Sequence, residues 1–231
     1  MSPATPGAAP IRPALLDALR SPSSPELEWL DGDALVCRPL ADRDLQALTD
    51  QVELAERRPR PDLPEGGPNS MHAYGATFEQ LGLVHLGRRW LEQLLQPLGE
   101  LHFGLSALDT LHAFAVHYAG DADLDLDLHV DQSDLTLNLC LDGWFEGGDL
   151  ELSGARCMDH LDLVAQPPEL HRIQHAPGQA VVHRGSVRHS VRPLEAGRRR
   201  GLILWARCGA HWDAGLPLGG CGPARCANAR L

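Results

Sequence analysis

The chain has 231 residues, a formal net charge of −11 and a sequence pI of about 5.5. This length suits one domain with a substantial core. An acidic surface repels phosphate backbones, which argues against general nucleic-acid binding. All 20 basic residues are arginine. Reactions that need a Schiff-base lysine and phosphate sites that need a P-loop lysine are therefore excluded.

Membrane and secretion signals are absent from the sequence pattern. No apolar run is long enough to span a membrane, and the N-terminus lacks the charged-then-apolar pattern of a signal peptide. The six cysteines are unevenly spread, which is typical of reduced thiols rather than of a disulfide framework. We therefore expect a cytoplasmic protein with no membrane partner.

The first hundred residues predict a lead-in followed by helices. Residues 1–25 are rich in Pro, Ala and Ser and are predicted to be mobile. Residues 42–57 and 88–98 carry apolar side chains at helical spacing. Between these two helices, residues 58–69 hold four prolines and two adjacent glycines, which indicate a loop. We expect residues 26–108 to form a helical support on the outside of a sheet.

From Asp109 the pattern changes to short strands separated by turn residues. The predicted strands are Leu111–Tyr118, Leu124–His129, Leu135–Leu141, Leu150–Leu152, Ala180–His183, Val187–Val191 and Gly201–Ala206. Many short strands with Gly- and Pro-bearing turns favour a sandwich or barrel. The last two strands, with a turn between them, predict a hairpin. We expect a mainly β core at residues 109–207 and a Cys-containing tail at 208–231.

Four aspartates alternate with other residues between Asp121 and Asp127. An EF-hand loop that begins at Asp121 would need Gly at its sixth position and Glu at its twelfth, where the chain has Leu126 and Gln132. The match to an EF-hand loop therefore fails. The alternation of Asp and Leu instead predicts a strand with one exposed and one buried face.

His129 and Asp131 follow directly on this alternation. Residues two apart in an extended chain point the same way, so an imidazole and a carboxylate project together from a strand end. They supply two ligands of a 2-His-1-carboxylate site, the arrangement that holds non-haem Fe(II) with open positions. The third ligand must come from elsewhere. Two histidines in predicted strands offer it, His183 and His189.

The wider sequence resembles a known family. The stretches that carry the resemblance are MHAYG with Gly82-Leu83, then DLDLHVDQSDLTLNLCL, FEGGDL, and the block PGQAVVHRGSVRHSVRP…GRRRGLILWAR. They look like the 2-oxoglutarate/Fe(II) dioxygenases of the prolyl 4-hydroxylase type. Within that family the chain most resembles the proteins named only as "2-oxoglutarate and iron-dependent oxygenase domain-containing". The similarity covers roughly residues 70–207.

The resemblance implies a double-stranded β-helix, a jelly-roll or cupin-like fold, with N-terminal helices braced against one sheet. It also implies that His129, Asp131 and His189 bind Fe(2+), because the family pattern places the distal ligand in the second histidine. His183 is then an imidazole of the core or of the ligands' surroundings.

The distal carboxylate of 2-oxoglutarate needs a cation inside the barrel, and arginine binds carboxylates bidentately. Three arginines are adjacent at 198–200, with Arg199 on the face opposite its neighbours. The resemblance selects Arg199, which lies ten residues after His189 and six before Trp205.

Three further residues are candidates for the cosubstrate pocket. The resemblance places Tyr118 where the family often has a tyrosine near 2-oxoglutarate. Thr136 and Asn138 share one strand face with Cys140. Their polar atoms on an otherwise apolar strand suggest that this face lines a wet pocket.

The implied activity is hydroxylation of a C–H bond of an amino-acid side chain, free or peptidyl, with release of succinate and CO2. The cofactors are Fe(2+) and 2-oxoglutarate, with ascorbate as a further candidate. The partners are O2 and an unidentified small-molecule or peptide substrate. Halogenating relatives lack the ligand carboxylate, so Asp131 favours hydroxylation.

Two other readings of the whole chain stay open: an inactive jelly-roll binding module, and a dioxygenase that acts on a small molecule other than an amino acid. The tail has its own alternative, which is a small zinc site. Its candidate ligands are Cys208, His211, Cys221 and Cys226.

Overall fold

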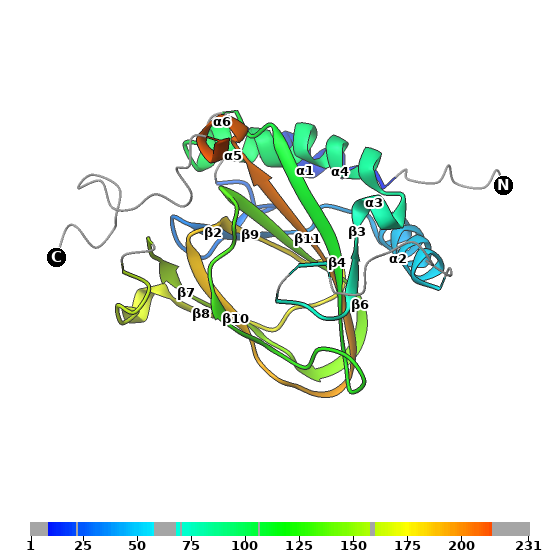
Figure 1. Cartoon of the computed structure of the whole chain (residues 1–231). Coiled ribbons are helices and arrows are strands. Elements are labelled where there is room, and N and C mark those ends of the chain that lie inside the picture. Colours follow the sequence, from blue (N-terminus) through cyan, green and yellow to red (C-terminus); the bar gives the residue numbers. More distant parts are fainter. Residues whose placement is uncertain are drawn as a thin grey trace.

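Two antiparallel sheets face each other in the computed structural model, which describes residues 9–21, 23–57, 68–69, 71–105, 107–157 and 160–213 (Figure 1). The larger sheet has the strand order β1 (Glu28–Trp29), β2 (Ala34–Cys37), β9 (Ala180–Arg184), β6 (Leu135–Gly147), β11 (Leu194–Arg207), β4 (Thr110–Ala119) and β3 (Gly75–Thr77). The smaller sheet has the order β5 (Leu126–His129), β10 (Val187–Val191), β7 (Leu150–Ala155) and β8 (Leu170–Ile173). The expected mainly β jelly roll is confirmed.

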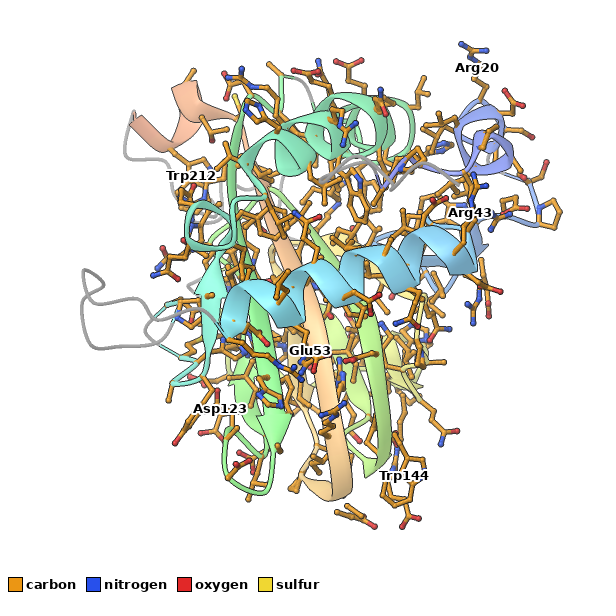
Figure 2. The ribbon with its side chains drawn as sticks, turned by 90° about the vertical axis from the view of Figure 1, so that its right-hand side faces the viewer. Arg20, Arg43, Glu53, Asp123, Trp144 and Trp212 are labelled. Atoms are coloured by element: carbon orange, nitrogen blue, oxygen red, sulfur yellow. The ribbon has the colours of Figure 1, made fainter. Side chains whose placement is uncertain are left out.

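Most of the helices cover the outer face of the seven-stranded sheet. The helical elements are α1 (Pro13–Ala18), α2 (Asp42–Glu56), α3 (Phe78–Leu81), α4 (Val84–Trp90), the π-helical turn η1 (Leu91–Leu95), α5 (Gln96–His102), the 3-10 turn η3 (Pro167–Glu169) and α6 (Gly209–Asp213). Figure 2 shows α2 lying across the long strands, where Glu53 of this helix pairs with Arg200 of β11 at 3.4 Å. The predicted helical support is thus present.

Alternation along the central strands separates two apolar cores. On β6, Leu135, Leu137, Leu139 and Leu141 pack against the helices. The intervening side chains of Thr136, Asn138 and Cys140 are also buried, and they lie on the opposite face, between the two sheets. The second core fills this inner space with side chains such as Phe114 of β4 and Leu152 of β7. The face of this strand that was predicted to line a pocket therefore lies in the interior of the barrel.

Part of the predicted lead-in is packed on the domain. Ile11 and Leu15 are buried in the outer core, and the Trp90 indole donates to the carbonyl of Ala9 at 3.1 Å. The short apolar patch of α1 accounts for this docking, because its burial offsets the cost of ordering the chain. Residues 1–8, most of the loop 58–69 and residues 214–231 lie outside the described residues. The domain limits drawn from the sequence stay predictions.

The predicted hairpin between residues 187–191 and 201–206 is wrong. β10 pairs with β5 and β7, whereas β11 pairs with β4 and β6, so the chain crosses from one sheet to the other after Val191. The crossing puts β10 and β11 in opposite sheets. The inner apolar face of each strand is then buried against the facing sheet. β11 is also longer than expected and begins at Leu194.

The predicted strand Leu124–His129 is confirmed from Leu126 onward, but the buried face predicted for it is wrong. β5 begins only at Leu126, and the side chains of Leu124 and Leu128 are 46% and 56% exposed. β5 lies at the edge of the smaller sheet, so its outward face meets solvent. The leucines of the repeat therefore do not form a continuous buried face.

Among the described residues, no helix combines the length and the apolar composition that crossing a membrane requires.

The outer core gives a test of the fold. Leu137 is fully buried, whereas Leu54 on α2 is 58% exposed. We expect Leu137→Ala to lower the free energy of unfolding by about 3 kcal/mol, because the change leaves a cavity under the helices. Leu54→Ala, the matched control, is expected to change it by about 0.5 kcal/mol or less. Urea denaturation measures both, and equal losses would contradict the packing described.

Candidate metal centre

Two histidines face each other across neighbouring strands of the smaller sheet. His129 at the end of β5 is the direct partner of His189 on β10, and the centroids of their rings lie 4.1 Å apart. His189 is buried, and His129 is partly exposed. The pairing of β5 with β10 thus joins two residues that are 60 positions apart in sequence.

Asp131 reaches this pair from the turn that follows β5. Its backbone N–H donates to the carbonyl of Gly185, 2.9 Å away in the turn between β9 and β10. A Cβ at residue 185 would lie only 1.8 Å from the carbonyl oxygen of Ser133, so this close approach requires glycine. The hydroxyl of Thr136 on β6 donates to Oδ2 of Asp131 at 2.7 Å. Both sheets therefore hold the carboxylate in place.

The three side chains form a compact set of ligand atoms. Oδ1 of Asp131 lies 3.5 Å from Nε2 of His129 and 3.6 Å from Nε2 of His189. One ligand atom from each residue lies within 4.8 Å of the other two. Among the described residues this is the one group of His, Cys, Asp and Glu that can hold a metal ion. The geometry joins the three residues that the sequence analysis selected.

Backbone carbonyls fix the tautomers of both histidines. Nδ1 of His129 lies 2.7 Å from the carbonyl of Asp127, and Nδ1 of His189 lies 3.0 Å from that of Val187. A carbonyl can only accept a hydrogen bond, so each Nδ1 carries the proton. In the neutral ring, the lone pair is then at Nε2, which faces the carboxylate, and this is the orientation that a metal-binding imidazole needs.

Burial and mutual charge shift the pKa values of all three side chains. Burial alone would raise the pKa of Asp131, but His189 and then His129 hold it well below its usual range. Burial lowers the pKa of His189 to about 3. For His129, burial opposes protonation, but the hydrogen bond and charge of Asp131 outweigh it and raise the pKa.

His183, the alternative third ligand, lies beside the set on β9 of the larger sheet. Its Nε2 is 3.9 Å from Oδ2 of Asp131, and its ring centroid is 4.6 Å from that of His189. Its Nδ1 donates to the carbonyl of Arg184 at 2.8 Å. His183 is not part of the compact set of three. Its position fits an imidazole that surrounds the ligands, as the resemblance implied.

Arg199 is buried in the interior of the barrel with its side chain 1% exposed. Arg199 lies on β11, where its backbone is opposite Tyr118 of β4 on one side and Gly143 of β6 on the other. Its NH1 donates to the carbonyl of Gly148 at 2.7 Å and its NH2 to Nδ1 of His175 at 2.8 Å. No carboxylate of the described residues lies within ion-pair distance of this guanidinium. A buried cation held only by neutral acceptors is poorly compensated and suits an anionic ligand.

The other predicted pocket residues also face the interior. The Tyr118 hydroxyl is hydrogen-bonded to Nε2 of His72 at 3.0 Å, and burial raises the pKa of this phenol. Oδ1 of Asn138 is buried without a hydrogen-bond partner among the described residues. Thr136 is committed to Asp131 rather than free to meet a cosubstrate. The roles of these residues stay predictions.

Two interior histidines were not predicted. His72 contacts Tyr118, and His175 contacts Arg199. His72 lies in the MHAYG stretch, so the resemblance could have pointed to it. His175 precedes a Pro-Gly turn and has no signal of its own, because its contact depends on how distant loops meet.

The proposed zinc site in the tail stays untested. Cys208 is buried, and its backbone N–H donates to Asp134 Oδ2 at 2.7 Å. The side chain of His211 and both cysteines of the tail, Cys221 and Cys226, lie outside the described residues.

A triad of two imidazoles and one carboxylate between jelly-roll sheets defines a class: double-stranded β-helix proteins with residues that can hold one metal ion. Two solved structures share this fold. A Pseudomonas putida prolyl-4-hydroxylase aligns with a TM-score of 0.53 and 18% identity, over 84% of this chain and 97% of that one. EvdO2 from Micromonospora carbonacea, solved with 2-oxoglutarate, aligns with a TM-score of 0.50 and 15% identity, over 76% and 86%. At these identities the likeness establishes the fold.

Sequence comparison identifies the relatives. The chain is 40% identical over 143 residues to "2-oxoglutarate and iron-dependent oxygenase domain-containing protein CP2" of Arabidopsis thaliana, which is 61% of this chain and 36% of that protein. It is 38% identical over 177 residues to "2-oxoglutarate and iron-dependent oxygenase domain-containing protein 2" of Homo sapiens, 75% of this chain and 48% of that protein. No protein-family model matches.

Over the matched residues the chain is homologous to the 2-oxoglutarate and iron-dependent oxygenase domain-containing proteins, and the resemblance expected from the sequence is confirmed. The chain spans less than half the length of these relatives.

The hydroxyl of Thr136 gives a test of the metal centre. We expect Thr136→Val to weaken Fe(II) binding about tenfold, because Asp131 loses the donor that orients it. Thr136→Ser keeps the hydroxyl and should bind Fe(II) nearly as the parent does. Anaerobic titration against a competing chelator measures the affinity. Equal affinity of the Val variant and the parent would show that this contact does not support the site.

The buried, neutral His175 gives a test of pH dependence. Burial and the charge of Arg199 lower its pKa from 6.5 to about 3. Below about pH 6.5, His175 therefore takes up a proton in the unfolded chain but not in the folded chain. The contribution of His175 to folding stability is thus fully present above pH 6.5 and is lost as the pH falls. We expect His175→Asn to remove about 2 kcal/mol of the fall in unfolding free energy between pH 7 and pH 5. Urea denaturation at both pH values would detect it; an unchanged fall would show that His175 is protonated in the fold.

Proposed function

We propose that the chain is an Fe(II)- and 2-oxoglutarate-dependent oxygenase. His129, Asp131 and His189 are the proposed metal ligands, and Arg199 is the proposed partner of the distal carboxylate of 2-oxoglutarate. The observation that carries the proposal is the buried guanidinium of Arg199, which meets only neutral acceptors among the described residues. It shares the barrel interior with a compact two-histidine, one-carboxylate set.

The donor set fits Fe(II). Two imidazoles that present Nε2 and one carboxylate are the ligands of non-haem Fe(II) oxygenases, which leave further positions on the metal open. Thr136 and the carbonyls of Asp127 and Val187 orient these donors, as surrounding hydrogen bonds do in other metal sites. His129 is the one partly exposed residue of the three.

When bound, Fe(II) and 2-oxoglutarate would supply the oxidising chemistry: one O2 is consumed, 2-oxoglutarate becomes succinate and CO2, and one oxygen atom enters a C–H bond of the substrate. This chain's residues bind and orient. Arg199 offers Nε–H, one N–H on NH1 and one on NH2 beyond its two described hydrogen bonds. Two of these donors suffice for a bidentate contact with a carboxylate.

The proposed substrate is an amino-acid side chain, free or within a peptide, with Fe(2+), 2-oxoglutarate and O2 as the other reactants. Its support is the shared fold of a solved prolyl-4-hydroxylase. Asp131 supports the type of reaction instead: it fills the ligand position that halogenating relatives leave to a halide, which favours hydroxylation. A small molecule of another kind is the alternative substrate. We further propose a cytoplasmic location, supported by four free cysteines among the described residues.

Anaerobic titration with Fe(II) and 2-oxoglutarate tests the proposal. We expect the weak visible charge-transfer band of the chelate to form in the parent. His129→Ala should abolish the band, since one ligand is lost. Arg199→Gln should raise the 2-oxoglutarate concentration needed for half-formation about tenfold or more, because a charged hydrogen bond contributes about 1.5–3 kcal/mol.

Two controls make the result specific. Arg198→Gln removes an exposed neighbouring charge on the opposite face of β11 and should leave the titration unchanged. Pyruvate has the same 2-oxo acid group but no distal carboxylate, so its binding should not depend on Arg199. If folded parent protein gives no band with either acid, the oxygenase proposal fails and an inactive binding module is the better account.

A further inference from the structure

His175 lies in the connection between β8 and β9, outside the metal centre, and is buried. Its Nε2 is 2.8 Å from the carbonyl of Gln179, and its Nδ1 is 2.8 Å from NH2 of Arg199. Since the carbonyl can only accept, Nε2 carries the proton and Nδ1 has a lone pair. The imidazole therefore accepts a hydrogen bond from Arg199 in one fixed tautomer.

A second acceptor completes the support of Arg199. NH1 donates to the carbonyl of Gly148, in the turn between β6 and β7. The two ends of the guanidinium are thus anchored to two different loops, which fixes both the position and the plane of the fork. The rings of Tyr118 and Phe145 flank it, with centroids 5.5 and 5.9 Å from the guanidinium carbon.

The chemistry of the acceptor matters as much as its position. An aspartate or glutamate in place of His175 would neutralise Arg199 and compete with an incoming carboxylate. A neutral imidazole holds the fork and leaves its charge uncompensated. Burial keeps this imidazole neutral, with its pKa lowered to about 3. A side chain that only filled space here would need no nitrogen aimed at Arg199.

We propose that His175 is a positioning residue for cosubstrate binding: it holds the Arg199 guanidinium in the orientation that receives the distal carboxylate of a 2-oxo diacid. The inference rests on the proposed function, because it assigns Arg199 to that carboxylate. It adds a residue that neither the sequence pattern nor the metal centre indicates.

Two near-isosteric variants separate the two hydrogen bonds of His175. Asn carries an oxygen near the position of Nδ1, so His175→Asn keeps the acceptor for Arg199 and loses the donor to Gln179. Gln places its amide near Nε2, so His175→Gln keeps the donor and loses the acceptor. The readout is the charge-transfer titration with anaerobic Fe(II), in the full chain, with 2-oxoglutarate and with pyruvate.

We expect His175→Gln to weaken 2-oxoglutarate binding about tenfold and His175→Asn to stay within about threefold of the parent. Pyruvate binding should be the same in all three proteins, which also shows that the variants fold and bind metal. In Arg199→Gln, the further change His175→Gln should have little additional effect, because the residue acts through Arg199.

Three results would overturn the inference while leaving the oxygenase proposal intact: equal 2-oxoglutarate affinity of the Gln variant and the parent, equal weakening in the Asn and Gln variants, or a parallel loss of pyruvate binding. The last would indicate a general structural role. Absence of any band in the parent would instead refute the proposed function itself.

Discussion

The interior of this barrel is organised around a positive charge that the described residues do not neutralise. Arg199 is inside, while Arg200, its neighbour in sequence, is on the outer face and meets the carboxylates of Glu53, Glu56 and Asp142. Adjacent residues of β11 thus differ in their partners: Arg200 is paired with carboxylates, whereas Arg199 is held by a carbonyl and an imidazole. Burying a charge is costly unless a partner compensates it. At Arg199, the distal carboxylate of the proposed cosubstrate would offset that cost.

The metal centre depends on a different constraint, which is the meeting of two turns. The turn after β5 carries Asp131, and the turn between β9 and β10 carries Gly185. Two backbone hydrogen bonds join these turns, from Asp131 N–H to the Gly185 carbonyl and from Gly185 N–H to the Asp134 carbonyl, and their contact is too close for any side chain at 185. Since β10 begins two residues later, the same contact sets the position of His189. Ligands that are distant in sequence thus share one local support.

Local patterns predicted much of this arrangement. Period-two alternation located most of the strands of the core, and the spacing of His129 and Asp131 identified a pair that the structure does bring together. Alternation placed Arg199 on the face opposite Arg198 and Arg200, and the resemblance selected Arg199 as the inward-facing residue. Each of these inferences uses information within a few residues or within the spacing of one family motif.

The predictions that were wrong concerned contacts between segments that are distant in sequence. The strands at 187–191 and 201–206 look like a hairpin locally, yet each pairs within a different sheet. Leu124 and Leu128 look buried by alternation, yet both are exposed to solvent, and β5, which holds Leu128, is an edge strand. His175 has no pattern, because its contact with Arg199 joins two segments that meet only when the barrel closes. Sequence alternation states which face a side chain takes but not what lies opposite it.

The position of Asp131 at the junction of the two sheets has a thermodynamic consequence. Both histidines belong to the smaller sheet, while Thr136 on the larger sheet orients the carboxylate between them. An ion bound there would link the layers, and it would bind the unfolded chain far less well. At a free metal concentration 100 times the dissociation constant, such linkage adds about 2.7 kcal/mol to folding stability. Metal supply would then govern how long the protein persists as well as whether it can react.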